Sequence, residues 1–453
     1  MNYKQTVEYL YDLGKFGSKP GLERMQWLLD ELGNPHHGLP VIHVGGTNGK
    51  GSTCCYISEV LVSAGYDVAQ YSSPHLQTIR ERILLNGEYV SKRDFAENIS
   101  AVKEIVDREL NNGREHPTFF EILTAAMFLQ CDRSGVDVLV GEVGLGGRFD
   151  ATNVVEAPLV AVITNIGLEH TEVLGDNLAD IAFEKGGIIK PGCRVVIGDK
   201  KKESVEVLTD LSEQRGVPLV QVMKCNTTHG FPDEAIGYDI EKVDSGGGIL
   251  SFYGHKWELS EVEVGMLGEH QLQNAACALA AVEQLELAEN NFNLSEKTIR
   301  EGIRAASWPG RVEKVDDNPI TILDGAHNPG GAEVLAETIE KILPHRKVHA
   351  VVGVLEDKDY PTMLRCMRDV INGKVFATTA PTPRSLSADD LHSAAEDVMP
   401  HSQIVSCEEA QDAVGKCLQA AKPGDVVVVW GSLYLVGEVR NRWYDLDESP
   451  QKY

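Results

Sequence analysis

Short, unbroken runs of apolar residues alternate with amphipathic stretches along almost the whole chain. Runs rich in Val, Ile and Leu are typical of parallel β-strands that are covered on both faces. Such strands are expected at Val41–Val44, Val136–Val143, Leu159–Ile166, Arg194–Ile197, Ile320–Asp324, Lys347–Val354, Lys374–Thr379 and Asp425–Trp430. Helices are expected between them, among others at Thr53–Ala64, Phe119–Ser134, Gln271–Leu285 and Ala332–Leu343. This alternation predicts an α/β fold with mostly parallel sheets and right-handed crossovers.

The pattern changes at two places. Residues from Gln221 to Leu259 form short, Gly-rich pieces, which predict a β excursion. The polar stretch Glu286–Lys297 follows an Ala-rich helix, and Ser295 is placed to cap the next helix. We therefore expect two domains, residues 1–296 and 297–453, with a cleft between them. A chain of 453 residues agrees with this division, since an average domain takes ~150 residues.

The charge balance narrows the choice of partners. Forty-two Lys and Arg against 68 Asp and Glu give a net charge of −26, a sign that repels nucleic acid and anionic membranes. The chain has no apolar run of ~18 residues and no signal-peptide core at its start, so a soluble, cytoplasmic protein is expected. Its nine cysteines are scattered and are expected to be reduced. An anionic ligand would need a concentrated local binding device.

One glycine-rich segment supplies such a device. VIHVGGTNGKGST (41–53) joins a buried strand to a helix, where backbone N–H groups and the helix start attract phosphate. Lys50 would reach the β- and γ-phosphates, and Ser52 would place a hydroxyl on Mg²⁺. The usual pattern GxxxxGK[ST] is not met, because Gly51 separates these two residues; the alternative is a glycine-rich turn with an exposed lysine. The residues assigned to the nucleotide are Thr47, Asn48, Gly49, Lys50, Gly51 and Ser52.

Polar residues lie where several predicted strands end. Glu142 closes the apolar run VDVLVGE, where a carboxylate is unfavourable unless it is paired or bound to a metal. His170 ends AVITNIGLEH in the same way, and Ser73 lies in YSSPHL, a Pro-held turn after a strand. Ligands bind off the carboxyl ends of strands in open parallel sheets, so these three groups can converge. Each also has an ordinary alternative: a salt-bridged Glu, a hydrogen-bonded His and a turn-forming Ser.

The glycine-rich loop and nine further motifs carry a family resemblance. GTNGKGS resembles the ATP loop of the folylpolyglutamate synthase and dihydrofolate synthase family, a branch of the Mur ligase superfamily, whose other members usually carry Thr at the position of Gly51. Other motifs in the family's order include YSSPHL, RERILLNGEYVS, TFFEILTAA, EVGLGGRFDATN, NIGLEHTEVLG, FEKGGIIKPG, GEHQLQNAACALAA, WPGR and LDGAHNP. The resemblance covers nearly the whole chain. It implies a P-loop Rossmann-like parallel-sheet domain followed by a smaller Rossmann-like α/β C-terminal domain.

The resemblance also implies a metal site. The family's Mg²⁺ ligands match Ser73, Glu142 and His170, and an oxygen-dominated set with a phosphate partner favours Mg²⁺ over zinc. Lys185 of FEKGGIIKPG matches a lysine that carries a carbamate in the similar enzymes and helps to hold a second Mg²⁺. A carbamate would turn this cation into an anionic oxygen ligand. Gly186 stands where the family usually has Ala, and taken alone Lys185 would be a surface lysine.

Residues in the second half of the chain match the family's nucleotide contacts. The resemblance implies that Asn274 pairs with the adenine edge, that Arg311 approaches the phosphates and the transferred group, and that Asp324 meets the ribose. His327 is expected to contact phosphate or the incoming amine, with a weaker alternative as a general base. The segments that line the pteroate pocket in similar enzymes match Phe120, Glu121, Phe149, Asp150 and Ala151. Phe120 has an equal alternative in the core, and Asp150 is favoured because a loop carboxylate can meet the donor groups of a pterin ring.

The implied reaction is ATP-driven amide ligation with two Mg²⁺ ions. The carboxylate of dihydropteroate or a reduced folate takes the γ-phosphoryl group, and the α-amine of L-glutamate then displaces phosphate. A closing interdomain cleft, hinged at residues 286–297, would protect the acyl phosphate from water. A monomeric, bifunctional dihydrofolate synthase/folylpolyglutamate synthase is expected. The alternatives are a folylpolyglutamate synthase only, a Mur-type amino-acid ligase, and a nucleotide-binding regulatory module without ligase activity.

Overall fold

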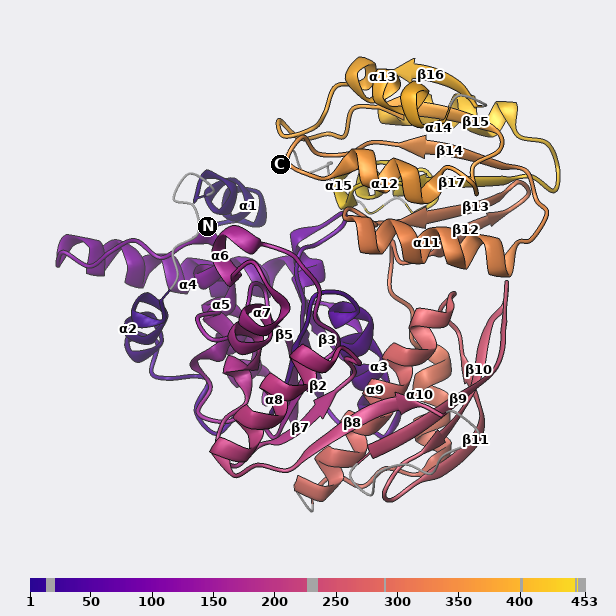
Figure 1. Cartoon of the computed structure of the whole chain (residues 1–453). Helices are drawn as coiled ribbons and strands as arrows, with labels where there is room; N and C mark the ends of the chain where they lie inside the picture. Colours follow the sequence, from indigo (N-terminus) through magenta and orange to yellow (C-terminus); the bar gives the residue numbers. More distant parts are fainter. Residues whose placement is uncertain (14–20, 226–234, 289–290, 400–401, 445, 447–453) are drawn as a thin grey trace.

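Two sheets, each in its own domain, build the molecule (Figure 1). The computed structural model describes residues 1–13, 21–225, 235–288, 291–399, 402–444 and 446. Within them, the first sheet has eleven strands in the order β11-β10-β9-β8-β7-β6-β1-β5-β2-β3-β4, and the second has six in the order β12-β13-β17-β14-β15-β16. Figure 1 shows the second domain in orange to yellow. The expected two-domain α/β fold, with a large sheet domain before a smaller one, is confirmed.

The first sheet is parallel in its centre and antiparallel at both edges. The central strands β9, β8, β7, β6, β1, β5 and β2, in that order, are parallel to one another. The outer strands β3, β4, β10 and β11 pair antiparallel. The bounds are β1 (Val41–Gly45), β2 (Val68–Tyr71), β3 (Ile83–Leu85), β4 (Glu88–Tyr89), β5 (Val138–Glu142), β6 (Val160–Ile163), β7 (Arg194–Ile197), β8 (Leu219–Lys224), β9 (Ala235–Asp244), β10 (Gly247–Tyr253) and β11 (Glu258–Val264). The β excursion expected after Gln221 therefore extends the parallel sheet as a meander, apart from residues 226–234, which lie outside the described residues.

Helices cover both faces of this sheet. Their bounds are α1 (Tyr3–Asp12), α2 (Glu23–Glu31), α3 (Lys50–Ser63), α4 (Lys92–Asn111), α5 (Phe119–Ser134), α6 (Thr171–Leu174), α7 (Leu178–Lys185), α8 (Lys202–Arg215), α9 (Glu269–Ala288) and α10 (Glu296–Ala305). One buried cluster joins the sheet to α3, α9 and α10, and two clusters on other surfaces involve α1, α2, α4 and α5 and then α7 and α8. In the described chain, no helix is both long and apolar enough to cross a membrane.

The second domain repeats the pattern on a smaller scale. Its strands β13, β17, β14, β15 and β16 are parallel, and β12 pairs antiparallel with β13. The bounds are β12 (Glu313–Asp317), β13 (Ile320–Asp324), β14 (Val348–Val352), β15 (Lys374–Thr378), β16 (Gln403–Cys407), β17 (Val426–Trp430), α11 (Pro329–Ile342), α12 (Tyr360–Met367), α13 (Ala388–Val398), α14 (Ala410–Ala420) and α15 (Leu433–Arg440). Strands β12 and β16 were not predicted from apolar runs, because they are partly exposed edge strands with few buried residues.

Helix α10 corrects the expected domain division at one point. A boundary at 296–297 assigns this helix to the second domain, but Ile299 and Ile303 lie in the same buried cluster as Val60 of α3. A Cβ at Gly302 would lie 2.4 Å from the Cα of Val60, so the two helices cross in close contact. The chain therefore leaves the first sheet after α10, and the proposed hinge at 286–297, of which residues 289–290 lie outside the described part, precedes a helix of the first domain.

Candidate functional site

The central strands bring the sequence motifs to one edge of the first sheet. β1 lies between β5 and β6, with Val44 opposite Glu142 and Gly45 opposite Ile163. β2 pairs with β5 on its other side and leads to the turn that holds Ser73. Because these strands are parallel, their carboxyl ends meet, and the segments that follow them form a common site.

The glycine-rich loop after β1 is held by the segment after β6. The Thr47 N–H donates to the Asn165 carbonyl at 2.9 Å, and the Asn48 N–H donates to Asn165 Oδ1 at 2.9 Å. Thr164 Oγ1 donates to the Asn48 carbonyl at 2.7 Å. These bonds fix the loop backbone before any ligand enters, which is the preorganisation that an anion site requires.

Two segments pack tightly on the start of α3. A Cβ at Gly49, where φ is +83°, would lie 2.4 Å from Asn274 Oδ1, and a Cβ at Gly51 would lie 2.9 Å from Trp308 Nε1. Only glycine fits the first position without strain. The unusual Gly51 between the lysine and the serine is therefore explained by the close approach of the Trp308 ring.

Asn274 and Ser52 are linked through one residue of α9. Asn274 Nδ2 donates to Gln271 Oε1 at 3.1 Å, and Gln271 Nε2 donates to Ser52 Oγ at 3.3 Å. These two hydrogen bonds place Asn274, the expected adenine contact, close to Ser52, whose hydroxyl is expected to face the metal. A separate cavity of 710 Å³ is lined on α9 by Glu269, His270 and Gln273.

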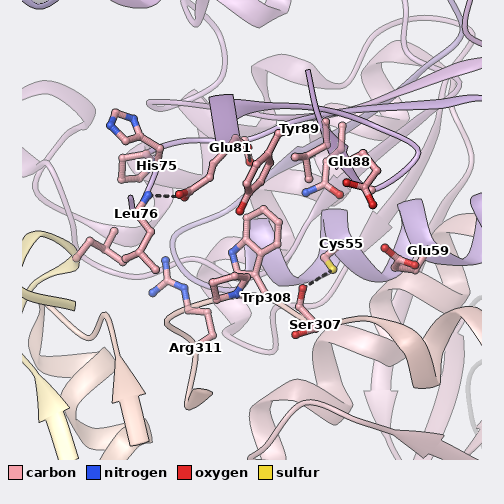
Figure 2. Close-up of a pocket in the computed structure, with 17 residues that line it drawn as sticks. Cys55, Glu59, His75, Leu76, Glu81, Glu88, Tyr89, Ser307, Trp308 and Arg311 are labelled. Atoms are coloured by element: carbon pink, nitrogen blue, oxygen red, sulfur yellow. Dashed lines mark hydrogen bonds between the residues drawn. The ribbon is translucent and has the colours of Figure 1, made fainter. Parts of the chain in front are cut away.

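A cavity of 330 Å³ lies beside the segment that joins the domains (Figure 2). Trp308 lies in its wall between Arg311 and Ser307, and Cys55 Sγ of α3 donates to the Ser307 carbonyl at 3.4 Å. Glu81 also lines this cavity, but it accepts the Leu76 N–H at 2.6 Å and so stabilises its own turn. The family resemblance implied a nucleotide contact for Arg311, and Arg311 lies at the junction of the two domains.

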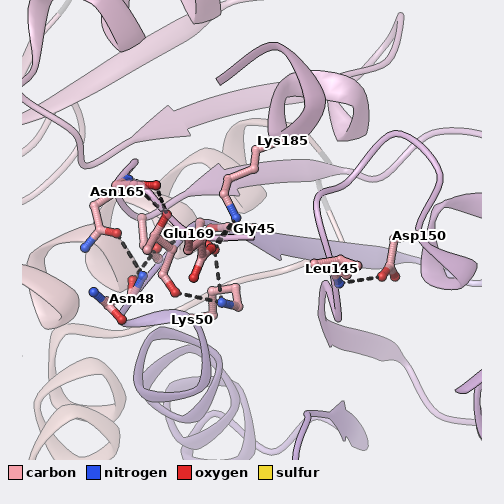
Figure 3. A network of polar contacts seen from close by, with 12 residues as sticks. Gly45, Asn48, Lys50, Leu145, Asp150, Asn165, Glu169 and Lys185 are labelled. Carbon is pink, nitrogen blue, oxygen red and sulfur yellow. Dashed lines mark hydrogen bonds and ion pairs between the residues drawn. The ribbon is translucent and has the colours of Figure 1, made fainter. Parts of the chain in front are cut away.

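Two lysines meet at the end of β1 (Figure 3). Lys50 Nζ donates to the carbonyls of Gly46 and Thr47, at 3.0 and 2.9 Å, and neither partner is a carboxylate. Lys185 is 2% exposed, and its Nζ donates to the Gly46 carbonyl at 2.9 Å and to Glu169 Oε1 at 2.7 Å. Burial, together with the charge of Lys50, lowers the pKa of Lys185 to about 8. Lys185 is therefore a buried site amine and not a surface lysine.

The expected metal residues are placed at the same edge, but only some of them touch. Ser73 N–H donates to Glu142 Oε2 at 3.1 Å, and the described residues offer no hydrogen bond to the other carboxylate oxygen. Burial raises the pKa of Glu142, opposed by the nearby charge of Lys50. A desolvated carboxylate with a free oxygen fits a hard cation. In the described chain, no three His, Cys, Asp or Glu side chains are arranged to hold a metal ion, and His170 has no hydrogen bond to Ser73 or Glu142.

Asp324 ends β13 in the second domain and is 7% exposed. Its two carboxylate oxygens accept the N–H groups of Val312 and Ala326, each at 2.8 Å. Burial raises the pKa of Asp324, and the positive charge of Arg311 opposes that shift. Asp324 thus holds the segment that carries Arg311, while each oxygen keeps a lone pair for a hydroxyl donor.

His327 lies in the loop between β13 and α11. Its Nδ1 lies 2.8 Å from the Gly325 carbonyl, and burial lowers its pKa to about 4. Lys358, in the loop after β14, lowers the pKa of both His327 and His170 through its charge. Lys358 could not be predicted from the sequence, because no local pattern indicates that this loop reaches the first domain.

All five residues expected on the folate side line one cavity of 580 Å³. Its walls come from the start of α5, the loop after β5 and the turn at Ser73. Phe149 is 44% exposed and lies under the Arg148 guanidinium, 4.6 Å from the ring centre. Phe120 packs so closely on Gly144 that a Cβ there would lie 2.5 Å from the ring. The side chains that line this cavity include those of Ser73, Arg82, Phe120, Glu121, Phe149, Asp150 and Ala151.

Two acidic residues of this cavity are already occupied by protein partners. Glu121 Oε1 and Oε2 accept from Arg24 at 3.0 to 3.1 Å, and Oε2 also accepts the Thr118 N–H at 2.7 Å. Asp150 Oδ2 accepts the Leu145 N–H at 2.8 Å. These hydrogen bonds favour a structural role for both carboxylates, and direct contact of either with a substrate stays a prediction.

Arg82 is the cation that sequence analysis missed in this cavity. It is 8% exposed, its Nε donates to His75 Nδ1 at 2.9 Å, and its guanidinium lies 5.3 Å from the centre of the Phe119 ring. Among the residues that line the cavity it is the only Lys or Arg. Burial raises the pKa of Glu142, and the charge of Arg82 is among those that oppose this rise, so Arg82 lies within electrostatic reach of that carboxylate. An arginine just before an apolar strand was the available signal.

Comparisons with known proteins place the chain in a family. Residues 44–282 match the Mur ligase middle domain, and residues 310–433 match the Mur ligase glutamate ligase domain. The chain belongs to the Mur ligase family. Within it, the chain is 36% identical over 442 residues to the dihydrofolate synthase/folylpolyglutamate synthase of Bacillus subtilis, covering 97% of this chain and 99% of that protein. It therefore belongs to the dihydrofolate synthase/folylpolyglutamate synthase branch, as expected from its motifs.

Solved structures of that branch have the same fold. E. coli FolC in complex with DHPP and ADP matches with a TM-score of 0.84 and 29% identity, over 98% of this chain and 97% of that one. The bifunctional folylpolyglutamate synthase/dihydrofolate synthase of Yersinia pestis, complexed with AMPPNP and Mn ion, matches with a TM-score of 0.81 and 30% identity, over 98% of both chains. The similarity thus extends over both domains.

Proposed function

We propose that this chain is an ATP-dependent ligase that joins L-glutamate to the carboxylate of dihydropteroate or a reduced folate through an acyl phosphate. The observation that carries the proposal is the arrangement at one sheet edge. A preorganised phosphate loop with Lys50 and a buried carboxylate, Glu142, lie next to a 580 Å³ cavity with aromatic walls and one arginine. Relatives solved with ADP and DHPP, and with AMPPNP and Mn ion, support it.

ATP would bind across the two domains. The loop N–H groups from Asn48 onward and the start of α3 bind the phosphates, and Lys50 exchanges its two carbonyl partners for phosphate oxygens. Asn274, whose side chain lies against Gly49 of the phosphate loop, would offer its amide to the purine edge. Arg311 meets the phosphates, and Asp324 accepts a ribose hydroxyl. The position of Arg311 at the junction of the two domains supports a nucleotide site that spans both.

A divalent cation fits the oxygen groups beside the phosphate loop. Ser73, Glu142 and His170 would hold one Mg²⁺, and a carbamate on Lys185 would help to hold a second. These ions supply neutralisation of the charge on the transferred phosphoryl group. The neutral amine that a carbamate requires is favoured by the burial of Lys185, which lowers its pKa to about 8.

The protein's own groups then position the two reactions. Arg82 orients the substrate carboxylate, whose oxygen attacks the γ-phosphorus while ADP leaves. The α-amine of L-glutamate next attacks the acyl carbon, and the C–O bond to phosphate breaks. His327 is neutral above about pH 4 and contacts the phosphate or amine without a charge of its own. Most of the catalytic effect would come from position and electrostatics, since phosphoryl transfer needs little covalent chemistry from the protein.

A product assay tests the proposal directly. Purified protein is given ATP, Mg²⁺ and L-glutamate with either dihydropteroate or tetrahydrofolate, and each product is identified by mass spectrometry. A glutamyl product from both substrates is expected for the bifunctional enzyme. Product from tetrahydrofolate alone would reduce the assignment to a folylpolyglutamate synthase. ATP consumption that depends on neither substrate would contradict ligation of folates.

The setting of the enzyme is a further part of the proposal. We infer a monomer in the cytoplasm. All nine cysteines are free, which is typical of a reducing compartment. Light scattering at micromolar concentration, with one chain mass expected, checks the oligomeric state.

A further inference from the structure

A histidine lies in the middle of the central strand of the first sheet. His43 on β1 is 1% exposed, and burial lowers its pKa to about 3, so the ring is neutral in the folded protein. Its Nε2 lies 2.8 Å from Thr152 Oγ1. Nothing in the proposed reaction uses this residue, and the ring does not line the folate-side cavity.

The hydrogen bonds at Thr152 have only one consistent direction. The Thr152 hydroxyl donates its single hydrogen to Asp150 Oδ1, because each oxygen of that carboxyl group already accepts a backbone N–H. Thr152 Oγ1 must therefore accept from His43, so the ring hydrogen lies on Nε2. The other ring nitrogen, Nδ1, is then an acceptor, and it is buried without a hydrogen-bond partner among the described residues. The result is a directed relay from His43 through Thr152 to Asp150.

Asp150 also joins the two ends of the loop that contains it. Its Oδ1 also accepts the Thr152 N–H at 3.0 Å, and its Oδ2 accepts the Leu145 N–H at 2.8 Å, so the two ends of segment 145–152 are tied to one carboxylate. Residues 145–147 and 149–151 of this segment line the 580 Å³ cavity. The orientation of Asp150 therefore sets the wall of that cavity.

The unpartnered Nδ1 distinguishes His43 from an ordinary packing residue. A buried acceptor without a donor is unfavourable, and an aliphatic residue at this strand position would avoid it. His43 retains that unfavourable atom while donating from Nε2 to Thr152. The bond from Nε2 to Thr152 is therefore the polar contact that distinguishes His43 from an aliphatic residue at this position.

We propose that His43 is a positioning residue, which fixes the wall of the folate-side cavity through Thr152 and Asp150 and so sets the affinity for the pteroate-type substrate without touching it. This inference rests on the proposed function for its substrate. The relay itself is a property of the fold.

Four variants test the relay. His43→Leu and Thr152→Val each break it, whereas His43→Gln keeps an N–H donor that can reach Thr152. His349→Leu is the matched control, since His349 is also 1% exposed on a central strand, but in the second domain, where it lies 3.3 Å from Asp425. The KM values for dihydropteroate and ATP are measured, together with amide hydrogen exchange of segment 144–152.

We expect His43→Leu and Thr152→Val to raise the KM for dihydropteroate about tenfold, the size of one lost hydrogen bond to a charged network, and to speed exchange in segment 144–152. The KM for ATP stays within about twofold, His43→Gln regains most of the loss, and His349→Leu changes neither reading. Unchanged KM and exchange in His43→Leu would overturn the inference, and so would an equal rise in both KM values or the same effect in His349→Leu. If the wild-type protein makes no glutamyl product, the proposed function fails, while the exchange measurement still decides whether the relay holds the loop.

Discussion

Two glycine-rich loops follow neighbouring strands of the first sheet, and each carries a charged side chain. The two side chains differ in the hydrogen-bond partners that the protein gives them. The loop after β1 carries Lys50, whose amine donates only to backbone carbonyls of its own loop. The loop after β5 carries Asp150, whose carboxylate accepts from two backbone N–H groups and a hydroxyl. Both charges lie at strand ends that look equally suited to bind a ligand. Only the first is left with weak, exchangeable partners.

The difference separates a ligand-binding charge from a structural one. A cation held by neutral carbonyls gains when a phosphate replaces them, because charge-assisted hydrogen bonds are stronger than neutral ones. A carboxylate that already accepts several hydrogen bonds gains little from a further donor and loses the loop if it moves. Mutations should therefore affect catalysis most on the β1 side and affinity or stability most on the β5 side.

The largest effect is expected for Lys50→Ala. It removes a fixed positive charge from the transferred phosphoryl group and should lower kcat by about 10²- to 10³-fold, the loss typical of one preorganised contact. Lys202→Ala, an exposed lysine on α8, serves as the control. Steady-state ATP turnover with both substrates measures the change. Near wild-type turnover in Lys50→Ala would contradict the assignment of residues 47–52 as a phosphate-binding loop.

Lys185→Ala should come next, with a loss of about 10²-fold, and a short carboxylic acid such as acetate should partly restore it by replacing the carbamate. An added amine would restore it instead if the ammonium form were the active one. Because the pKa of Lys185 is lowered to about 8, the neutral amine grows as pH rises from 6 to 8. Reactivation of CO₂-depleted wild-type enzyme by bicarbonate should therefore become faster over that range. A rate independent of pH would argue against the carbamate.

Glu142→Gln should act on the metal and on stability in opposite directions. Loss of the carboxylate charge should raise the Mg²⁺ concentration for half-maximal activity about tenfold. Burial raises the pKa of Glu142 above its ordinary 4.5, so the ionised group destabilises the fold increasingly as pH rises from that value through the folded pKa. At pH 7 the variant should therefore melt at a higher temperature than wild type. An unchanged Mg²⁺ titration would mark Glu142 as merely structural.

In the cavity that Asp150 also lines, Glu121→Gln on α5 should affect stability more than catalysis. It removes the buried partner of Arg24, whose side chain is 7% exposed, and leaves it the half-exposed Glu115 at 3.3 Å, so it should destabilise the first domain by about 3 kcal/mol. Glu97→Gln breaks the exposed pair with Arg93 and should leave the melting temperature unchanged. Chemical denaturation and the KM for dihydropteroate measure the two consequences. A large rise in that KM without destabilisation would instead indicate that Glu121 contacts the substrate.

Local sequence patterns were sufficient for elements whose signals lie within the element. α5 runs from Phe119 to Ser134 as expected, because Thr118 and Glu121 form a capping box and Gly135 ends the helix in a left-handed conformation. The apolar runs likewise located the buried central strands. Patterns could not assign α10 to its sheet, because an amphipathic face does not specify its partner.

Long-range packing also explains the site residues that patterns missed. Glu169, Arg82 and Lys358 reach the site because loops from distant strands meet there, and no local spacing records such a meeting. The same limit applies to Asp150. Its residue type suggested a ligand contact, whereas its partners, Leu145 and Thr152, are known only from the folded loop.

The smallest effect is expected for Glu269→Gln, which alters an exposed charge between the domains. Glu269 Oε1 accepts from Lys224 of β8 at 2.7 Å, and Oε2 pairs with Lys341 of α11 in the second domain. All three side chains are 41 to 49% exposed, so solvent screens the pairs and the loss should stay below about 1 kcal/mol, with kcat within about twofold. Turnover measured at 10 mM and 500 mM salt checks this, since high salt should abolish the remaining difference. A larger and salt-insensitive loss would mean that this ion pair restrains domain closure, and then charge at the molecular surface would matter as much as charge at the strand ends.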